Sequence, residues 1–475
     1  MEVSRRVLAR AASGVFASLV VTSVALAQAG SKAASAPKPA AQQAPKAPQA
    51  PQFTVDMLWP KPLPTHQLLG SAVGVAVDAQ DHVFVVHRID SFTARTEIGA
   101  GATPPIAECC LSAPPVLEFD ATGKLVNSWG GPGAGYDWPA IPSGIGIDPT
   151  GNVWIAGSGG LDGQVLVFAH DGKFVRQIGK AGTMPAAAPA AGPDTAYLGV
   201  SPGGRGGRAG ADSTAGRGGR GAGAAGAAGA AGFAVPAAGR GGRGGRGGPA
   251  PTLPPNSANT DMFGGATRIA FDAASGTAFI ADGLRNRRVV TVDISTGAVK
   301  MFFGAYGKTP SDAPTPAYSA DAAPSQQFSG VACAKVAKDG LVYVCDRNND
   351  RIQVFKTDGS FIKEAKVAPA TLGEGSVWDI AFSADANQRY LYVADGANQK
   401  VRILDRVNLQ ELTAFGEGGR VPGMFYAVHS IATDSRGNVY TTETYEGKRV
   451  QKFNFKGMGP VTKANQGVLW PGAAK

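Results

Sequence analysis

The sequence is poor in the residues from which metal centres, disulfide frameworks and charged disordered chains are built. Its 475 residues include five histidines and four cysteines, and charged side chains make up 17%. The cysteines show no CxxC or Cys/His spacing typical of a zinc module, and five histidines leave little material for a three-imidazole site. Charge is too low, and hydrophobic content (44%) too high, for a wholly disordered chain. A globular domain is the first expectation.

Long apolar runs and helical periodicity are also missing. The longest apolar stretch, residues 14–27, is too short and too interrupted by Ser and Thr for a membrane span, and no amphipathic helix pattern exceeds two turns. Arg5, Arg6 and Arg10 precede this stretch, which is the layout of an export signal over residues 1–29. The string SRRVLAR resembles the twin-arginine motif, so the general and twin-arginine routes both stay open. We expect a periplasmic or secreted protein with no transmembrane anchor after signal cleavage.

Glycine and proline are abundant, with 66 and 33 residues, and many of them gather in two segments. Residues 30–52 consist mostly of Ala, Pro, Gln and Lys and indicate an extended linker. Residues 181–259 contain Gly/Arg and Gly/Ala repeats and indicate a low-complexity surface insertion. Without these segments and the export signal, the formal charge of +9 falls to about −1. The basic composition therefore gives no reason to expect a nucleic-acid partner.

The remaining sequence repeats a strand that alternates around an aromatic or apolar centre. The copies lie at 83–88, 153–158, 278–283, 342–347, 391–396 and 439–444. Three irregular segments separate some of them, at 89–115, 181–259 and 305–325. Without those segments the copies recur roughly every 40 to 50 residues, the period of β-propeller blades. The sequence predicts an all-β, six-bladed propeller over residues 53–460, with the insertion between blades two and three.

The sixth predicted blade lacks an outer strand. After residues 448–455 only an irregular tail remains, including 461–475. The unassigned strand-like segment is 53–60, which precedes the first blade. We expect this N-terminal segment to pair with blade six and close the ring, because closure removes unpaired sheet edges.

The four cysteines fall into two pairs. Cys109 and Cys110 are adjacent, a spacing that would strain a mutual disulfide. Cys333 and Cys345 lie on neighbouring predicted strands. They either form a disulfide across a hairpin or remain small buried hydrophobic residues, and the sequence leaves both open.

One segment resembles a known repeat. Residues 342–362, VYVCDRNNDRIQVFKTDGSFI, resemble the NHL repeat, and weaker copies lie at 281–293 and 394–405. Within that class the chain is most similar to the peptidyl-α-hydroxyglycine α-amidating lyases. These are six-bladed propellers that cleave hydroxyglycine-extended peptides to amides and glyoxylate at a central zinc. The similarity is strongest around VVHR (85–88) and VCDRNNDRIQVFK (344–356).

The resemblance assigns two arginines and one histidine to a site at the axis. The substrate-orienting arginines of the family match Arg88, which follows His87, and Arg347, which follows Asp346. One of the three zinc histidines matches His429.

The other family positions are not kept. The remaining zinc histidines fall at Gly163 and Ser329, the catalytic tyrosine at Leu284, and the aspartate beside the third histidine at Ser430. Zinc catalysis needs about three protein ligands and an ionisable group for proton transfer. The ligand set is therefore incomplete, although zinc and calcium both stay open as cofactors. We expect little zinc and no hydroxyglycine lyase turnover.

The predicted function is a ligand-binding or protein-binding module that works through its channel mouth. The candidate binding residues are Arg88, Arg347, His429, His87 and Asp346, with His429 also the candidate metal ligand and no catalytic residue assigned. Two arginines at one mouth favour a small anionic ligand, and a peptide or protein is the alternative partner. The alternative, which the sequence leaves open, is that each arginine pairs with an aspartate of a neighbouring blade as a structural bridge. His87 is expected to be more structural than functional.

Other functions stay open. An enzyme reading requires a lyase with altered zinc ligation, or a hydrolase with carboxylates around calcium. A third reading is a scaffold that anchors through the Gly/Arg-rich insertion. Asp282, Asp346 and Asp395 recur after the second strand of three blades, which favours a role in holding loop backbone. His66, His82 and His170 fall in predicted linkers or turns, away from any predicted site.

Overall fold

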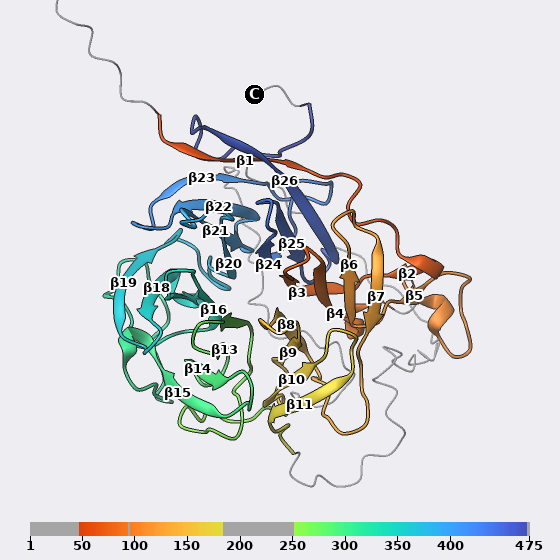
Figure 1. Ribbon diagram of the computed structural model, residues 1–475, viewed down its shortest axis with the longest axis horizontal. Helices are drawn as coiled ribbons and strands as arrows, with labels where there is room; N and C mark the ends of the chain where they lie inside the picture. Colours follow the sequence, from red (N-terminus) through yellow and green to blue (C-terminus); the bar gives the residue numbers. More distant parts are fainter. Residues whose placement is uncertain (1–46, 94–95, 184–250, 473–475) are drawn as a thin grey trace, which may run out of the picture. The chain divides into compact units, whose positions relative to one another are not determined.

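The computed structural model describes residues 47–93, 96–183 and 251–472. The export signal (1–29) and most of the predicted linker and insertion lie outside these residues. Within them, six four-stranded antiparallel sheets surround one centre (Figure 1). The predicted all-β, six-bladed propeller is confirmed. In the described part of the chain, no helix is both long and apolar enough for a membrane crossing.

Each blade runs from an inner strand beside the axis to an outer strand at the periphery. Blade 1 contains β3 (Ser71–Val77), β4 (Val83–Arg88), β6 (Val116–Phe119) and β7 (Leu125–Trp129). Blade 2 contains β8 (Pro142–Ile147), β9 (Val153–Gly157), β10 (Gln164–Phe168) and β11 (Phe174–Gly179). Blade 3 contains β12 (Ile269–Asp272), β13 (Thr277–Asp282), β14 (Arg288–Asp293) and β15 (Val299–Phe303).

The second half of the ring repeats this order. Blade 4 contains β16 (Val331–Val336), β17 (Leu341–Asp346), β18 (Arg351–Lys356) and β19 (Phe361–Lys366). Blade 5 contains β20 (Asp379–Phe382), β21 (Tyr390–Asp395), β22 (Lys400–Asp405) and β23 (Glu411–Phe415). Blade 6 contains β24 (Val428–Thr433), β25 (Val439–Glu443), β26 (Arg449–Pro460) and, as its outer strand, β1 (Gln49–Val55).

The remaining elements are short. β2 (Gln67–Leu68) and β5 (Leu111–Ser112) form a two-stranded parallel sheet beside blade 1. Five 3-10 turns occur in the described ranges: η1 (Pro64–His66), η2 (Ile89–Ser91), η3 (Gly99–Gly101), η5 (Ala305–Gly307) and η6 (Arg347–Asn349).

The repeated second strands form the core because both of their faces are covered by neighbouring blades. Their aromatic residues are almost fully buried, at Trp154, Tyr343, Tyr392 and Tyr440. The Trp154 ring of blade 2, for example, packs edge-on against Phe271 of blade 3, with centroids 5.3 Å apart. The inner strands are more crowded. A Cβ at Gly144 would lie 2.2 Å from the Thr267 carbonyl oxygen, so only glycine fits there.

The N-terminal strand closes the ring, as predicted, but its boundaries differ from the prediction. β1 pairs antiparallel with β26, from Gln49 opposite Pro460 to Val55 opposite Phe453. It therefore begins inside the predicted 30–52 linker. It ends before Trp59, whose ring instead packs on Tyr440, 5.0 Å away. The polar linker composition hid the strand, because only alternate side chains of an outer strand need be apolar.

The C-terminal tail is irregular, as predicted, but it is bound to the propeller. The Ala414 N–H of β23 donates to the Ala464 carbonyl oxygen at 2.9 Å, and the Val55 N–H of β1 donates to Leu469 at 2.8 Å. Leu469 also packs against the core that blades 5 and 6 share. The tail and β1 together cover the outer edges of these two blades.

The predicted insertion, 181–259, extends too far at its C-terminal end. The Leu253 N–H donates to the Gly160 carbonyl oxygen at 2.8 Å. Arg288, at the start of β14, donates through Nη1 to the Ser257 carbonyl oxygen at 2.6 Å. Residues 251–259 are thus part of the folded body, and residues 184–250 lie outside the described chain.

Both cysteine pairs are joined. Cys333 and Cys345 form a disulfide between β16 and β17, where their Cα atoms stand 4.9 Å apart in directly paired positions. This is the hairpin disulfide that the sequence left open. Cys109 and Cys110 are bonded to each other as well, against the expectation drawn from their adjacency.

Removing β1 should destabilise the ring. A chain that starts at residue 56 loses the strand paired with β26 and the buried side chains of Phe53 and Val55. We expect a loss of at least about 3 kcal/mol relative to a chain that starts at residue 47, because each such side chain contributes about 1.5–3 kcal/mol on burial. Urea unfolding of the two chains measures the difference, and equal midpoints would contradict the closure.

Deletion of the insertion should, in contrast to removal of β1, leave the ring stable. Replacing residues 184–250 by a short Gly/Ser linker should leave the melting temperature within a few degrees, because loop length costs only about 0.6 kcal/mol per doubling. Extending the deletion to 181–259 should lower it, since Arg288 then loses the Ser257 carbonyl oxygen. Equal melting temperatures for the two deletions would show that this contact contributes nothing.

Candidate functional site

The axis of the propeller is crossed by one arginine. Arg268 directly precedes β12 in blade 3, and its side chain is 3% exposed. Its guanidinium donates to the Ser143 carbonyl oxygen of blade 2 at 2.6 Å, to Asp379 Oδ2 of blade 5 at 3.0 Å and to the His429 carbonyl oxygen of blade 6 at 2.9 Å. Blades 3 and 6 lie opposite each other in a six-membered ring. Arg268 therefore spans the channel.

Asp379 forms an ion pair with Arg268 and links the remaining blades to it. It accepts a hydrogen bond from Ser430 Oγ at 2.7 Å and lies 3.6 Å from Lys335 Nζ of blade 4. Ser430 Oγ in turn accepts from the Val75 N–H of blade 1 at 3.3 Å. Burial raises the pKa of Asp379, but Lys335 and Arg268 outweigh it and hold the pKa below its ordinary value. The axial network, as we call these contacts, reaches all six blades.

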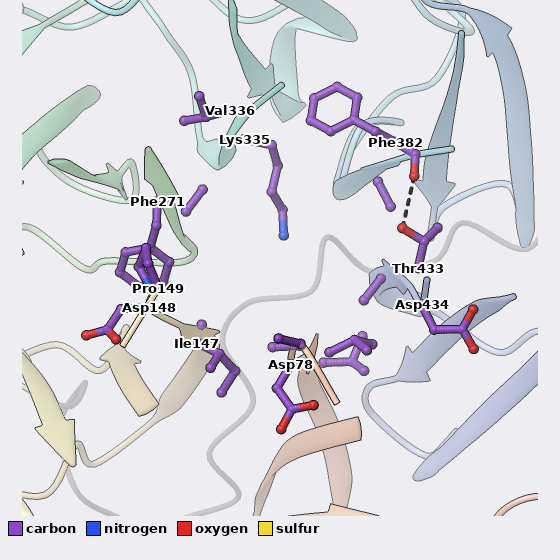
Figure 2. A pocket seen from close by; sticks show the side chains of 18 of the residues that line it. Asp78, Ile147, Asp148, Pro149, Phe271, Lys335, Val336, Phe382, Thr433 and Asp434 are labelled. Atoms are coloured by element: carbon purple, nitrogen blue, oxygen red, sulfur yellow. Dashed lines mark hydrogen bonds between the residues drawn. The ribbon is translucent and has the colours of Figure 1, made fainter. Parts of the chain in front are cut away.

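The channel has two mouths. We call the end at which the inner strands finish the lower mouth and the end at which they begin the upper mouth. The lower mouth opens into a cavity of about 790 Å³, lined by residues from all six blades. Lys335 points into this cavity, and Asp78, Asp148 and Asp434 lie around it (Figure 2). Asp148 and Asp434 accept hydrogen bonds from the backbone of their own turns. These hydrogen bonds give both carboxylates a structural role in their turns.

The predicted arginines lie at the upper mouth. Arg88 ends β4 in blade 1, and Arg347 begins η6 directly after β17 in the opposite blade 4. Arg88 Nη2 pairs with Asp90 Oδ2 at 2.8 Å, and Arg347 pairs with Glu374. Asp90 and Glu374 are 43% and 39% exposed. Solvent-exposed pairs of this kind contribute little to stability, so they hold the arginines only weakly.

Two aromatic rings stand beside these arginines. Arg347 lies over the Trp378 ring, 4.7 Å from its centroid, and the Tyr445 ring lies edge-on to Trp378 at 6.5 Å. Burial and Glu374 raise the pKa of Tyr445, whereas the nearby charges of Arg347 and Arg88 lower it. Tyr445 therefore lies within electrostatic reach of both arginines.

Tyr445 is held in an uncommon backbone conformation. Its φ is 50°, a left-handed value that is rare for an aromatic residue. Ser71 Oγ of blade 1 donates to its carbonyl oxygen at 2.6 Å and fixes the turn. The side chain stays 46% exposed. Backbone strain that presents an exposed aromatic ring at a channel mouth is the kind of feature that marks binding sites.

His429 lies on the axis between the upper mouth and Arg268. Its ring stands perpendicular to Trp378 at 5.7 Å, and its Nδ1 is 2.8 Å from the Val73 carbonyl oxygen. Burial lowers the pKa of His429 well below its ordinary value, and Arg268 and Arg347 lower it further. The ring is therefore neutral. Nδ1 faces both an acceptor, the Val73 carbonyl oxygen, and a donor, Arg268 Nη2 at 3.0 Å, so either neutral tautomer of the ring finds a partner there.

His87 and Asp346, which were predicted as ligand-binding residues, lie inside the fold and not at the mouth surface. The Gly70 N–H donates to His87 Nδ1 at 3.1 Å, and His87 Nε2 is 2.9 Å from the Pro114 carbonyl oxygen. Burial lowers the pKa of His87 to about 4. Asp346 is fully buried and accepts the Ser329 N–H at 2.7 Å. Both side chains are used to hold loops.

Asp346 belongs to an acid–arginine pair that recurs in four successive blades. The acid ends the second strand, and the arginine lies at or near the start of the third. The N–O distances are 2.6 to 2.8 Å in Asp282–Arg288, Asp346–Arg351, Asp395–Arg402 and Glu443–Arg449. The fold role predicted for the three aspartates is confirmed.

The other positions carried over from the amidating lyases do not form a zinc site. Gly163 has no room for a side chain, since its Cβ would lie 2.4 Å from the Lys180 carbonyl oxygen. Leu284 is partly exposed and has no ionisable group, and Ser430 belongs to the axial network. Among the described residues, no gathered group of three or more metal-ligating side chains includes His429.

Sequence reasoning missed three parts of this channel. Arg268 and Asp379 could have been found from the sequence, because each is a charged residue at the start of an otherwise apolar inner strand. No sequence pattern indicates Tyr445, since its position depends on a turn that only the folded ring brings beside Arg88. The third omission is a group of four side chains at the lower mouth: Asp78, His82, Glu118 and His170.

Neutralising the axial carboxylate should be strongly destabilising. Asp379→Asn leaves Arg268 and Lys335 buried without a counter-charge, so we expect a loss of about 3–5 kcal/mol in urea unfolding. Asp379→Asn combined with Arg268→Met removes both charges of the pair and should recover part of that loss. Asp171→Asn, at an exposed turn, is the matched control and should change little. An Asp379→Asn midpoint equal to that of the control would contradict the role of the network.

Comparison with known proteins finds one repeat family within the chain. The NHL repeat family model matches residues 328–355. Similar solved structures include a structural genomics protein of unknown function from Bacteroides thetaiotaomicron, with 12% identity over 86% of this chain and 77% of that chain, at a TM-score of 0.45. Virginiamycin B lyase from Staphylococcus aureus shows 13% identity over 85% of this chain and 99% of that chain, at a TM-score of 0.42. A streptogramin B lyase shows 10% identity over 86% and 98%, at a TM-score of 0.41.

Identities and scores at this level carry no argument about what the chain binds. The matched repeat covers Phe328, the hairpin of β16 and β17, and β18 as far as Phe355. It includes the buried Asp346–Arg351 pair that recurs around the ring. The chain is a six-bladed β-propeller with an NHL repeat in its fourth blade.

Proposed function

We propose that this protein is an exported binding module whose upper mouth holds a small anionic ligand with a flat apolar part. The observation that carries the proposal is that Arg347 lies over the Trp378 ring beside the exposed Tyr445, whose pKa the charges of Arg347 and, from the opposite blade, Arg88 both act to lower. The NHL propeller fold itself supports a binding or scaffold role. Export to the periplasm or cell exterior is supported by the arginine-led apolar segment before residue 29 and by the disulfides, which persist in oxidising compartments.

The charge of the mouth favours an anion. A guanidinium binds carboxylate or phosphate through two parallel hydrogen bonds and stays charged at any accessible pH. Burial lowers the pKa of Arg347, which Glu374 partly offsets. An anion arriving beside Arg347 competes with one carboxylate, Glu374, which is 39% exposed. Exchange of Glu374 or Asp90 for a ligand anion costs little, since exposed pairs are weak.

The shape of the mouth favours a flat group next to that anion. Tyr445 offers an exposed ring, and the Trp378 ring, buried under Arg347, lies edge-on behind it. A peptide that ends in an aromatic residue with a free carboxylate belongs to the same chemical class.

A lyase of the amidating type is the second candidate, and one observation favours it. Tyr445 supplies, from blade 6, the phenol that Leu284 cannot supply, and it lies near both Arg88 and Arg347. A peptide ending in α-hydroxyglycine tests this reading. Glyoxylate release that is lost in Tyr445→Phe would replace the binding-module proposal by an enzyme.

The binding proposal predicts weaker anion binding without the arginines. Titration calorimetry with phenyl phosphate and with benzoate should give saturable binding to the chain, and benzyl alcohol should not bind. Arg88→Ala and Arg347→Ala should each weaken phenyl phosphate binding about ten- to hundredfold, because a hydrogen bond to a charged group contributes about 1.5–3 kcal/mol. Binding should also weaken in 0.5 M salt.

Arg436→Ala provides the matched control. Arg436 is an exposed arginine in the lower turn of blade 6, so its loss changes the net charge equally without touching the upper mouth. An equal loss of affinity in Arg436→Ala would indicate general charge attraction. Unchanged affinity in both Arg88→Ala and Arg347→Ala would overturn the proposal.

A further inference from the structure

Two histidines and two carboxylates meet at the lower mouth, at the opposite end of the channel from Arg88 and Arg347. Asp78 follows β3, His82 precedes β4, Glu118 lies in β6, and His170 lies in the turn between β10 and β11 of blade 2. One ligand atom from each lies within 4.8 Å of all the others. The group therefore joins blade 1 to blade 2 at the rim of the cavity, which Asp78 and His170 both line.

Contacts within blades 1 and 2 hold each of these four side chains in position. Asp78 Oδ1 accepts the His82 N–H at 2.7 Å, which fixes the turn between β3 and β4. His82 Nδ1 lies 2.6 Å from Glu118 Oε1. The His170 ring packs edge-on against the buried Phe84 ring, with centroids 5.2 Å apart, which directs His170 of blade 2 over blade 1.

The carboxylates of this group are buried and poorly compensated. The side chains of Asp78 and Glu118 are each 3% exposed. Asp78 Oδ2 is buried and has no hydrogen-bond partner, although it faces His170 Nε2 at 3.5 Å. In the described ranges, no lysine or arginine nitrogen lies within 4 Å of either carboxylate. A buried carboxylate oxygen without a partner is costly, and a bound cation would remove that cost.

The donor set is that of a transition-metal site. Two imidazoles with two carboxylates suit zinc and related divalent ions, whereas calcium and magnesium prefer oxygen ligands alone. Donors about 2.1 Å from a tetrahedral ion stand about 3.4 Å apart. The pairs at 2.6 and 3.5 Å already match this spacing within an ångström. The widest pair must move closer, and the two histidines, 33% and 47% exposed, are free to do so.

We propose that Asp78, His82, Glu118 and His170 bind one divalent transition-metal ion of the zinc class at the lower mouth. The site does not depend on the anion-binding proposal, because it lies at the opposite end of the channel from Arg88 and Arg347. It also differs from the axial zinc position that the lyase resemblance implies, since His429 is not part of it. An ion held here faces the cavity and is reachable by a ligand that enters the lower mouth.

The test is metal binding by the full chain after treatment with a chelator. Zinc added in excess and then dialysed should remain at one ion per chain, measured by elemental analysis, and cobalt(II) should give a visible absorption band that zinc displaces. His170→Gln and Glu118→Gln should each weaken zinc binding at least tenfold. His170 is half exposed and accepts no close hydrogen bond, so its variant keeps the test valid if Glu118→Gln fails to fold.

His66→Gln is the matched control, because His66 is an exposed histidine outside the group. It should retain one zinc per chain, as should Arg347→Ala, which separates this site from the upper mouth. The proposal is overturned if the chain without substitutions retains no zinc. It is equally overturned if zinc binds with unchanged affinity to both His170→Gln and Glu118→Gln, which would place the ion elsewhere.

Discussion

The arrangement of the whole ring depends on the ion pair of Arg268 and Asp379 at its axis. A propeller needs its inner strands close together, yet their backbone amides and carbonyls at the strand starts face a channel instead of a neighbouring strand. Arg268 satisfies carbonyl groups of blades 2 and 6 at once, and Asp379 accepts from blade 6 and faces a lysine of blade 4. A buried charge pair of this kind adds little net stability, but removing one partner leaves the other charge buried and uncompensated, which is strongly destabilising. The same pair separates an upper mouth rich in arginine and aromatic rings from a lower mouth with a cavity.

The fold was predictable because each blade repeats a local pattern. Six second strands, each buried on both faces, give continuous apolar runs at a regular period, and tight glycine turns mark the hairpins. The predicted boundaries were wrong where the structure of a segment depends on a partner that is distant in the sequence. β1 was assigned too late in the chain because few of its side chains need be apolar. Residues 251–259 were assigned to the insertion because they contact the folded body through backbone atoms and a short polar side chain, Ser257, which no apolar pattern reveals.

The site was predictable only in part, for a related reason. Arg88, Arg347 and His429 were found through a resemblance that fixes strand positions, and a propeller places equivalent strand positions at the same mouth. His87 and Asp346 share those positions but point into the blades, which residue type alone does not reveal. Tyr445 and the Asp78, His82, Glu118 and His170 group combine residues from different blades. Nothing in the spacing of such residues along the chain indicates that they meet.

The join between β1 and β26 also sets the order in which the molecule can be completed during synthesis. The first strand to leave the ribosome pairs only with a strand made roughly 400 residues later. At about 5–20 residues per second, Phe53 and Val55 wait on the order of 20 to 80 s for their partner. Five blades can stack in that interval while the first strand stays open to other chains. Closure of this propeller is therefore a late event, which waits until β26 has been made.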